Sequence, residues 1–410
     1  MELSYVDRNR SATKNQLRFR TLVGLCGVMM LVSGNVREEA SAAEWSAEPS
    51  LSVKGEYNSN LLLFNGNNEV WGDWTSPALK FKGSTESLMV EGNVRSEFVH
   101  YYGSQNRSLT NLYFPLRTSY RWDRHTVNIE GGFTRDNTLR SELQQTGLVL
   151  AFTQRSVWTA RPTWTVGLTE RLNWQLGYQF TDATYENGLS FGLVNYQVQG
   201  GSSSMSYQAT ERDQVQFTGE YVRFETPAIQ QHWTYYGLGA SASHSFTESL
   251  IGTVSSGVRF IASTQDISGD SLTDHQNVWV YSGKLKQVFD RATITVEGSR
   301  EVNPSGFGSL LQTDRVGGSL SHNLTDTVTL SVEGATYFVT PLSSSTSRTF
   351  PQTRFTSVSP KISWTFAEWW SLGVGYSYAE RAVGALDQWN FANSTFVTLT
   401  YGGPKWSVSR

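Results

Sequence analysis

Apolar and polar residues alternate along most of the chain that follows residue 49. The clearest run is 172–180, LNWQLGYQF, in which every second residue is large and apolar. The same alternation recurs at 127–130, 293–297 and 328–333. Successive side chains of a β-strand point to opposite faces, so a period of two predicts strands with one apolar and one polar face.

A longer period frames these strands. Short turn-like segments with an acidic residue return roughly every 40 residues, which is typical of an architecture built from similar units. The acids are Glu86, Asp123, Glu170, Glu211, Glu248, Asp290, Asp326 and Glu368. Each interval holds two long strands and one longer loop. Eight tight turns joining sixteen strands, with one strand before and one after, predict eighteen strands; sixteen is the alternative.

Two architectures fit such a repeat, a soluble β-propeller and a transmembrane barrel. A propeller blade of this length packs four short strands, whereas each interval here supports two long ones. Barrels of the outer membrane join long tilted strands by short turns on one side and longer loops on the other. The sequence therefore predicts an all-β fold, an antiparallel transmembrane outer-membrane β-barrel.

Composition excludes several other classes. Charged residues are only 17% and aromatics 13%, unlike a disordered chain, and 33 Lys+Arg against 36 Asp+Glu is unlike a nucleic-acid binder. Thirteen of the 14 Trp gather near the predicted turns and loops, as the two interfacial belts of a membrane barrel would require. Trp122, Trp164, Trp174, Trp364, Trp369, Trp370 and Trp406 belong to the predicted inner belt, and Trp71, Trp74, Trp158, Trp233, Trp279 and Trp389 to the outer one.

The N-terminus has the features of an export signal. A basic stretch is followed by the apolar segment TLVGLCGVMMLV at 21–32 and by small residues at 40–43. We predict a cleaved signal peptide at 1–42, a short periplasmic segment at 43–49 and a barrel at 50–410, in the outer membrane of a Gram-negative bacterium. The only cysteine, Cys26, falls in the signal, so the mature chain has neither disulfides nor a thiol nucleophile.

The start of the predicted barrel, residues 49–63 (PSLSVKGEYNSNLLL), resembles a family of outer-membrane β-barrel porins that accompany exopolysaccharide and exosortase gene clusters. The first strand of that family commonly reads Tyr, a variable residue, Asp-Asn and then aliphatics. Here Tyr57, Asn58, Ser59 and Asn60 occupy those places, so the aspartate is replaced by Ser59. The resemblance implies a barrel that helps a polysaccharide cross the outer membrane with periplasmic export partners. It supplies no catalytic residues.

Polar positions of the alternating strands should line the lumen. At eighteen strands the side chains cannot fill the interior, so a wet channel is expected. The candidate lumen-lining residues are Glu91, Arg95, Glu97, Glu130, Gln175, Gln179, Glu220, Glu297 and Glu333. Glutamates dominate this set, which favours a mild preference for cations. Carbohydrate or other small hydrophilic solutes are the predicted cargo.

The loop at 137–155 is the longest predicted outer loop and contains the apolar patch 148–152. It folds into the barrel and narrows the pore, or the flanking strands extend past the membrane; the sequence leaves both open. No catalytic motif, cofactor motif or metal-ligand spacing accompanies the six histidines, so neither an enzyme nor a cofactor or metal site is predicted.

The sequence therefore predicts an outer-membrane channel for the passage or export of polysaccharide or other hydrophilic solutes. The alternatives are a general diffusion porin and a structural barrel with a closed lumen.

Overall fold

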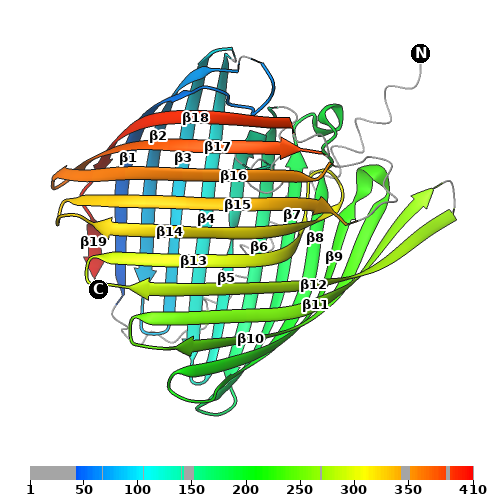
Figure 1. Cartoon of the computed structure of the whole chain (residues 1–410). Helices are drawn as coiled ribbons and strands as arrows, with labels where there is room; N and C mark the ends of the chain where they lie inside the picture. The colour runs from blue at the N-terminus through cyan, green and yellow to red at the C-terminus, as the bar shows by residue number, and fades with distance from the viewer. Residues whose placement is uncertain are drawn as a thin grey trace, which may run out of the picture. The chain divides into compact units, whose positions relative to one another are not determined.

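The structure, a computed structural model, describes residues 43–66, 68–104, 106–139, 141–142, 152–267, 270–342, 351–384 and 388–409. These ranges form one antiparallel sheet and two short 3-10 helices (Figure 1), and Thr138, Leu139, Ser141 and Glu142 are helical as well. The strands are β1 (Glu44–Asn58), β2 (Val70–Ser84), β3 (Leu88–Gly103), β4 (Arg107–Trp122), β5 (His125–Asn137), β6 (Gln154–Gly167), β7 (Leu172–Tyr185), β8 (Tyr196–Gln208), β9 (Asp213–Thr226), β10 (Gln231–Ser245), β11 (Leu250–Ile267), β12 (Asp270–Val288), β13 (Ala292–Pro304), β14 (Leu310–Asn323), β15 (Val328–Pro341), β16 (Thr353–Ala367), β17 (Trp370–Val383), β18 (Gln388–Gly402) and β19 (Trp406–Ser409). The helices are η1 (Gly188–Phe191) and η2 (Pro227–Ile229). Within the described ranges no helix has the length and apolar character needed to span a membrane.

The sheet closes on itself. Each strand pairs antiparallel with the one before it, and β1 pairs with β2 on one side and with β18 on the other, from Ser50↔Gly402 to Asn58↔Ser394. The four residues of β19 pair with the first residues of β1 and so continue the line of β18. The ring therefore has 18 strands, β1 to β18. The predicted all-β antiparallel barrel and its strand count are confirmed, and sixteen strands is wrong.

All eight predicted acidic turns join consecutive strands, and a threonine stabilises five of them. In five of them a Thr hydroxyl accepts a hydrogen bond from the backbone N–H three residues later, at 2.9–3.0 Å. These are Thr85, Thr169, Thr210, Thr247 and Thr325. Such a bond satisfies a backbone donor that the turn would otherwise leave unpaired. The sequence pattern located the turns by their acids, but the neighbouring threonine makes the local contact.

The first strand begins earlier than predicted. Residues 44–49, assigned from the sequence to a periplasmic segment, form the beginning of β1. They do so because Glu44 to Ala47 pair with β19 and the whole strand pairs with β2. The predicted signal peptide, 1–42, lies outside the described residues.

The two faces of the wall differ as the alternation predicts. Leu176, Tyr178 and Phe217 are among many large apolar residues exposed on one face, while their neighbours of opposite parity, such as Gln175 and Gln216, lie on the other. An exposed apolar face suits lipid, and a polar face suits a lumen.

Two tryptophans depart from the predicted outer belt. Trp71, Trp158, Trp279 and Trp389 are exposed on the apolar face. Trp233, by contrast, is completely buried on the inward face. The Trp74 ring also faces inward, where it packs edge-on against Tyr101 at 5.4 Å. Both occupy strand positions whose side chains point inward. The belt prediction used only how near each tryptophan is to a loop, and that nearness does not show which face of the wall the side chain occupies.

Candidate channel lumen

All nine residues predicted to line the lumen occupy positions of inward parity. Six of them take part in ion pairs, within one strand or between strands. Arg117 of β4 lies between Glu130, at 2.6 Å, and Glu91, at 3.9 Å. Arg95 pairs with Glu97 at 3.4 Å. Acidic and basic side chains are therefore paired with one another on the inward face of β3 to β5.

The same arrangement recurs on the far strands. Glu220 of β9 binds Arg259 of β11 at 3.0 Å. Glu297 of β13 binds Arg315 of β14 and lies 3.9 Å from Lys284. Glu333 forms no ion pair within the described residues, and Gln175 and Gln179 are uncharged. The structure therefore brings most of the predicted carboxylates together with arginines rather than leaving them as an acidic ring.

A cavity of about 880 Å³ lies against β1 to β6. Its charged lining consists of five basic side chains and three acidic ones, namely Lys80, Lys82, Arg117, Arg161, Lys405, Glu48, Glu91 and Glu130. Lys80, Lys82 and Arg161 have no ion-pair partner in the described part of the chain, whereas Glu91 and Glu130 share Arg117. Five minus three leaves a net charge of +2, which counts against the cation preference expected from the glutamates.

Towards the outer loops the inward face changes from polar to apolar. A cluster of buried residues is here called the outer-end cluster. It connects inward-facing residues of the strands from β7 to β12 with one residue of β13 and one of β14. It consists of Ala183, Tyr185, Leu193, Tyr196, Val198, Val222, Phe224, Trp233, Tyr235, Ile261, Val278, Val302 and Leu310. Inward residues in a wide barrel are buried only where something fills the lumen beside them.

Loops supply that filling. The β13–β14 loop reaches the β7–β8 loop, where the Val194 N–H donates to the Gly306 carbonyl at 2.7 Å. Gly308 lies so close to Val194 and Ile229 that a β-carbon there would meet their side chains at 3.0 and 2.7 Å. Since β7 and β13 are six strands apart in the ring, these loops narrow the outer end from two sides.

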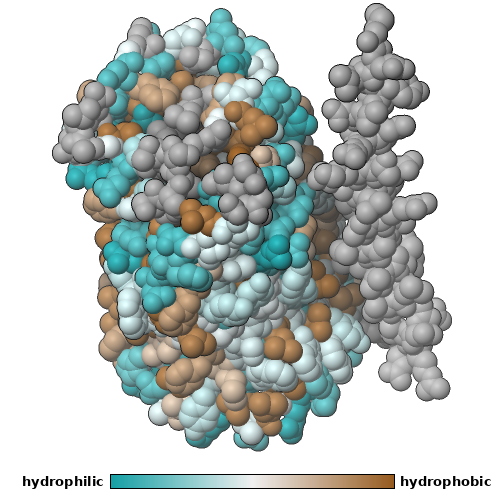
Figure 2. All heavy atoms as spheres, turned by 90° about the vertical axis from the view of Figure 1, so that its right-hand side faces the viewer, coloured by the Kyte–Doolittle hydropathy of each residue, from teal (hydrophilic) through white to brown (hydrophobic). Residues whose placement is uncertain are grey.

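The β1–β2 loop turns inward as well. Leu63 is buried with Phe355 and Ala392 on the inner face of β16 and β18. Its carbonyl accepts a hydrogen bond from Arg381 Nη2 at 2.5 Å, and the Arg381 guanidinium stacks over Phe64 at 4.8 Å. Figure 2 views the barrel from the side that carries the outer ends of the strands, and hydrophilic and hydrophobic residues are interspersed over it.

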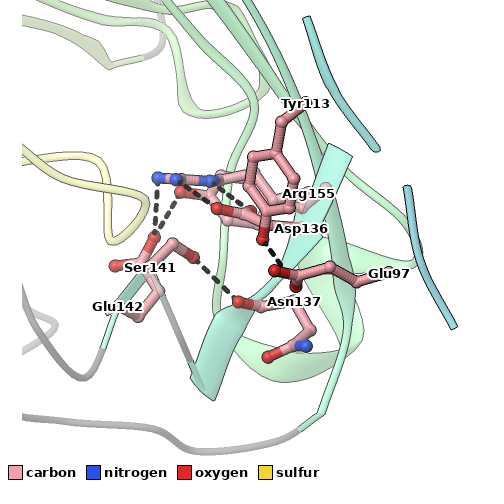
Figure 3. A network of polar contacts seen from close by, with 8 residues as sticks. Glu97, Tyr113, Asp136, Asn137, Ser141, Glu142 and Arg155 are labelled. Carbon is pink, nitrogen blue, oxygen red and sulfur yellow. Dashed lines mark hydrogen bonds and ion pairs between the residues drawn. The ribbon is translucent and has the colours of Figure 1, made fainter. Parts of the chain in front are cut away.

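A buried polar network ties the β5–β6 loop to the wall (Figure 3). Arg155 of β6 binds Asp136 of β5 through two hydrogen bonds of 3.1–3.2 Å and lies 3.9 Å from Glu142 of the loop. Glu142 accepts a hydrogen bond of 2.5 Å from Tyr185. Burial raises the pKa of Glu142 despite the nearby arginine.

The sequence left open whether this loop folds into the barrel or its flanking strands extend past the membrane, and the described ends of the loop answer part of that question. Leu139 and Phe152 are buried together with Leu62, and Phe152 packs against Tyr101 at 6.1 Å. Both ends therefore turn into the barrel. Residues 148–151 of the predicted apolar patch lie outside the described residues.

The functional residues that the sequence missed are those of the outer end. Asp136, Arg155, Glu142 and Arg381 carried no motif, and each is significant only through a partner on another strand or loop. The period-two pattern was the one available signal, because it places Asp136 and Arg155 at inward positions.

Comparison with known proteins adds little to this geometry. No protein-family model matches the chain, and no curated protein sequence matches it. Solved structures of similar outline include Acinetobacter baumannii OccAB3, at 10% identity over 88% of this chain and 99% of that chain, with a TM-score of 0.44. Pseudomonas aeruginosa OpdQ has 10% identity over 88% and 98% and a TM-score of 0.45. Pseudomonas aeruginosa OccK2 (OpdF), solved in complex with glucuronate, has 8% identity over 87% and 98% and a TM-score of 0.44. Because these TM-scores are low, the assignment of a barrel fold rests on the strand pairing of the chain itself.

Proposed function

We propose that the protein is an outer-membrane channel through which small hydrophilic solutes pass, with a transport role rather than a catalytic one. The observation that carries the proposal is a closed ring whose outward face exposes aliphatic and aromatic side chains and whose inward face is charged and encloses a cavity of about 880 Å³. A closed ring leaves no open sheet edge in the hydrocarbon, and a charged lumen offers water and solutes a path. The basic segment and apolar core at the N-terminus support export to the outer membrane of a Gram-negative bacterium.

The charge of the lumen favours anionic or neutral polar solutes. The net charge of +2 around the cavity reflects three basic side chains without an ion pair in the described structure, Lys80, Lys82 and Arg161, against one such acidic side chain, Glu48, while Glu91 and Glu130 share Arg117. Unpaired charges of one sign attract counter-ions into a narrow pore more strongly than compensated pairs do.

Polysaccharide export is the narrower hypothesis. It rests on the resemblance of residues 49–63 to porins of exopolysaccharide clusters, and it would bring periplasmic partners with it. Because inward loops narrow the outer end, export of a polymer requires those loops to move out of the lumen. A structural barrel requires that the same loops never move.

Single-channel recording tests the proposal. The full chain, purified from outer membranes, is placed in a planar bilayer under a salt gradient, and conductance and reversal potential are measured. We expect steady openings with a reversal potential on the anion side. The double variant K82Q/R161Q should move the potential towards zero, because it removes the net +2.

K284Q is the matched control, since Lys284 also faces the lumen but lies beside Glu297. It should shift the potential less than the double variant. A folded barrel that passes no current in any variant would leave only the structural alternative.

A further inference from the structure

One seam of the wall is only partly closed. β11 and β12 are the longest strands, with 18 and 19 residues, and they pair along their whole length. β12 pairs with β13 only from Tyr281↔Arg300 to Val288↔Thr293. From Asp270 to Val280 the edge of β12 has no ladder partner on β13 within the described residues. Figure 1 shows the β11–β12 hairpin running away from β13 towards its tip.

The seam opens at the height of the outer aromatic belt. Tyr281, the last paired residue of β12, and Trp279, the first aromatic beyond it, are both exposed on the outward face. Aromatic residues of this kind occupy the headgroup layer of a membrane barrel. Unpaired backbone groups are tolerated there because water reaches them, whereas they would be costly in hydrocarbon.

A side chain takes the place of the missing ladder. Arg259, on the inward face of β11, reaches past β12 and donates from Nη1 to the Val302 carbonyl of β13 at 2.9 Å. Its Nε binds Glu220 at 3.0 Å, and its guanidinium stacks over Tyr235 at 4.9 Å. The seam is therefore held by one long, partly exposed side chain and by apolar packing in the outer-end cluster.

A recess of about 370 Å³, lined by both polar and apolar residues, lies at the base of this seam. Glu220, Arg259, Ser255 and Ser282 line it from the lumen, and Tyr281 and Glu301 line it where β12 and β13 part. The recess thus runs from the lumen wall to the point at which the wall opens, while the axial outer end is narrowed by inward loops.

We propose that the β12–β13 seam is a lateral portal and that Arg259 is its latch. This inference rests on the proposed function as a channel and adds a route: solutes leave or enter sideways, at the level of the outer headgroups. Polar groups of the solute meet Glu220, Arg259 and the serines, and apolar groups meet Tyr281 and Trp279. The portal therefore suits amphipathic molecules that carry both hydroxyl or charged groups and an apolar chain.

Cross-linking tests the portal. Cysteines replace Val278 and Val302, which belong to the same buried cluster on either side of the seam, and a bis-maleimide joins them. The described chain has no cysteine of its own. We expect the cross-link to lower the conductance at least twofold. It should also abolish a block by octyl glucoside, below its micellar concentration, that glucose at the same concentration does not produce.

The control pair is K284C/E297C, which are register partners where β12 and β13 are fully paired. Each variant is compared with itself before and after cross-linking, so the lost charges do not confuse the result, and the control should not change. R259A should raise the conductance at least twofold. R315A should not, because Arg315 makes the same inward Glu and Tyr contacts where β13 and β14 are fully paired.

The outcomes separate the two proposals. Current and octyl glucoside block that survive cross-linking at Val278 and Val302 would overturn the portal and leave an axial channel. An R259A conductance equal to that of R315A would also overturn it. The absence of current in the folded wild type and in folded R259A would overturn the channel itself, and the portal with it.

Discussion

Within single strands the inward face is built in two ways. On β9, Gln216 and Glu220 face a wet lumen, and Glu220 is held by an arginine of β11. Further along the same strand and face, Val222 and Phe224 are buried in the outer-end cluster. The strand geometry is the same in both regions; what differs is whether a loop lies beside the side chain. Packing therefore stabilises the outer end, while hydration and paired charges suffice below it.

The largest expected difference in stability between two variants involves the outer-end cluster. Trp233 is completely buried, so W233A should lower the free energy of unfolding by about 3–5 kcal/mol. W279A removes the same ring from the outward face, where it is 65% exposed, and should cost less than half as much. Urea titration in lipid vesicles measures both. Equal losses would mean that the outer end is not a packed core.

The second comparison of stability is between a buried arginine and a half-exposed one. R155A leaves the buried carboxylate of Asp136 without its arginine and should cost about 3 kcal/mol or more. R135A removes a half-exposed arginine from the adjacent strand, 3.8 Å from Glu186, and should cost about 0–1 kcal/mol. The same titration compares them. If the two variants lost equal stability, burial would not be what makes the Arg155 network matter.

A pH effect on local stability should appear in the β5–β6 loop. Burial raises the pKa of Glu142 above that of the unfolded chain, so the folded loop holds the proton more tightly. Its contribution to stability is full below the ordinary glutamate pKa and is lost as the pH rises through the raised value. Ser141 is buried, so a cysteine at this position (S141C) becomes accessible only when the loop opens. Its rate of reaction with a soluble maleimide, divided by the rate at the exposed position in E170C, should therefore increase with pH.

The control for that effect is E142Q in the S141C background, in which the ratio of the two rates should no longer change with pH. A ratio that is flat in the parent as well would show that the loop does not depend on the protonation of Glu142.

The smallest effect is expected in the wet region. Gln175 is an uncharged, partly exposed residue on the lumen face of β7, so Q175A should change stability by no more than about 0.5 kcal/mol. A loss like that of W233A would mean that the lumen is packed at this height too.

Much of the fold was predictable because its signals are local. The eight acidic turns and the alternation of Leu172 to Phe180 each arise within a few residues, and together they predicted the strand count. Parity then placed Glu220 and Glu297 inward. Their arginine partners could not be predicted, since Arg259 is 39 residues from Glu220. For the same reason the glutamates suggested an acidic lumen that pairing largely neutralises.

By itself the sequence determined which residues extend, where the chain turns and which face of the wall meets lipid, because a strand's period of two and the conformation of a turn depend on near neighbours. Only the tertiary structure decided how the outer end is filled and where the wall is left open. The Leu63 carbonyl meets Arg381 across 318 residues, and β12 leaves β13 after Tyr281 with no local signal. Such contacts depend on closure of the ring, which no short stretch of sequence can specify.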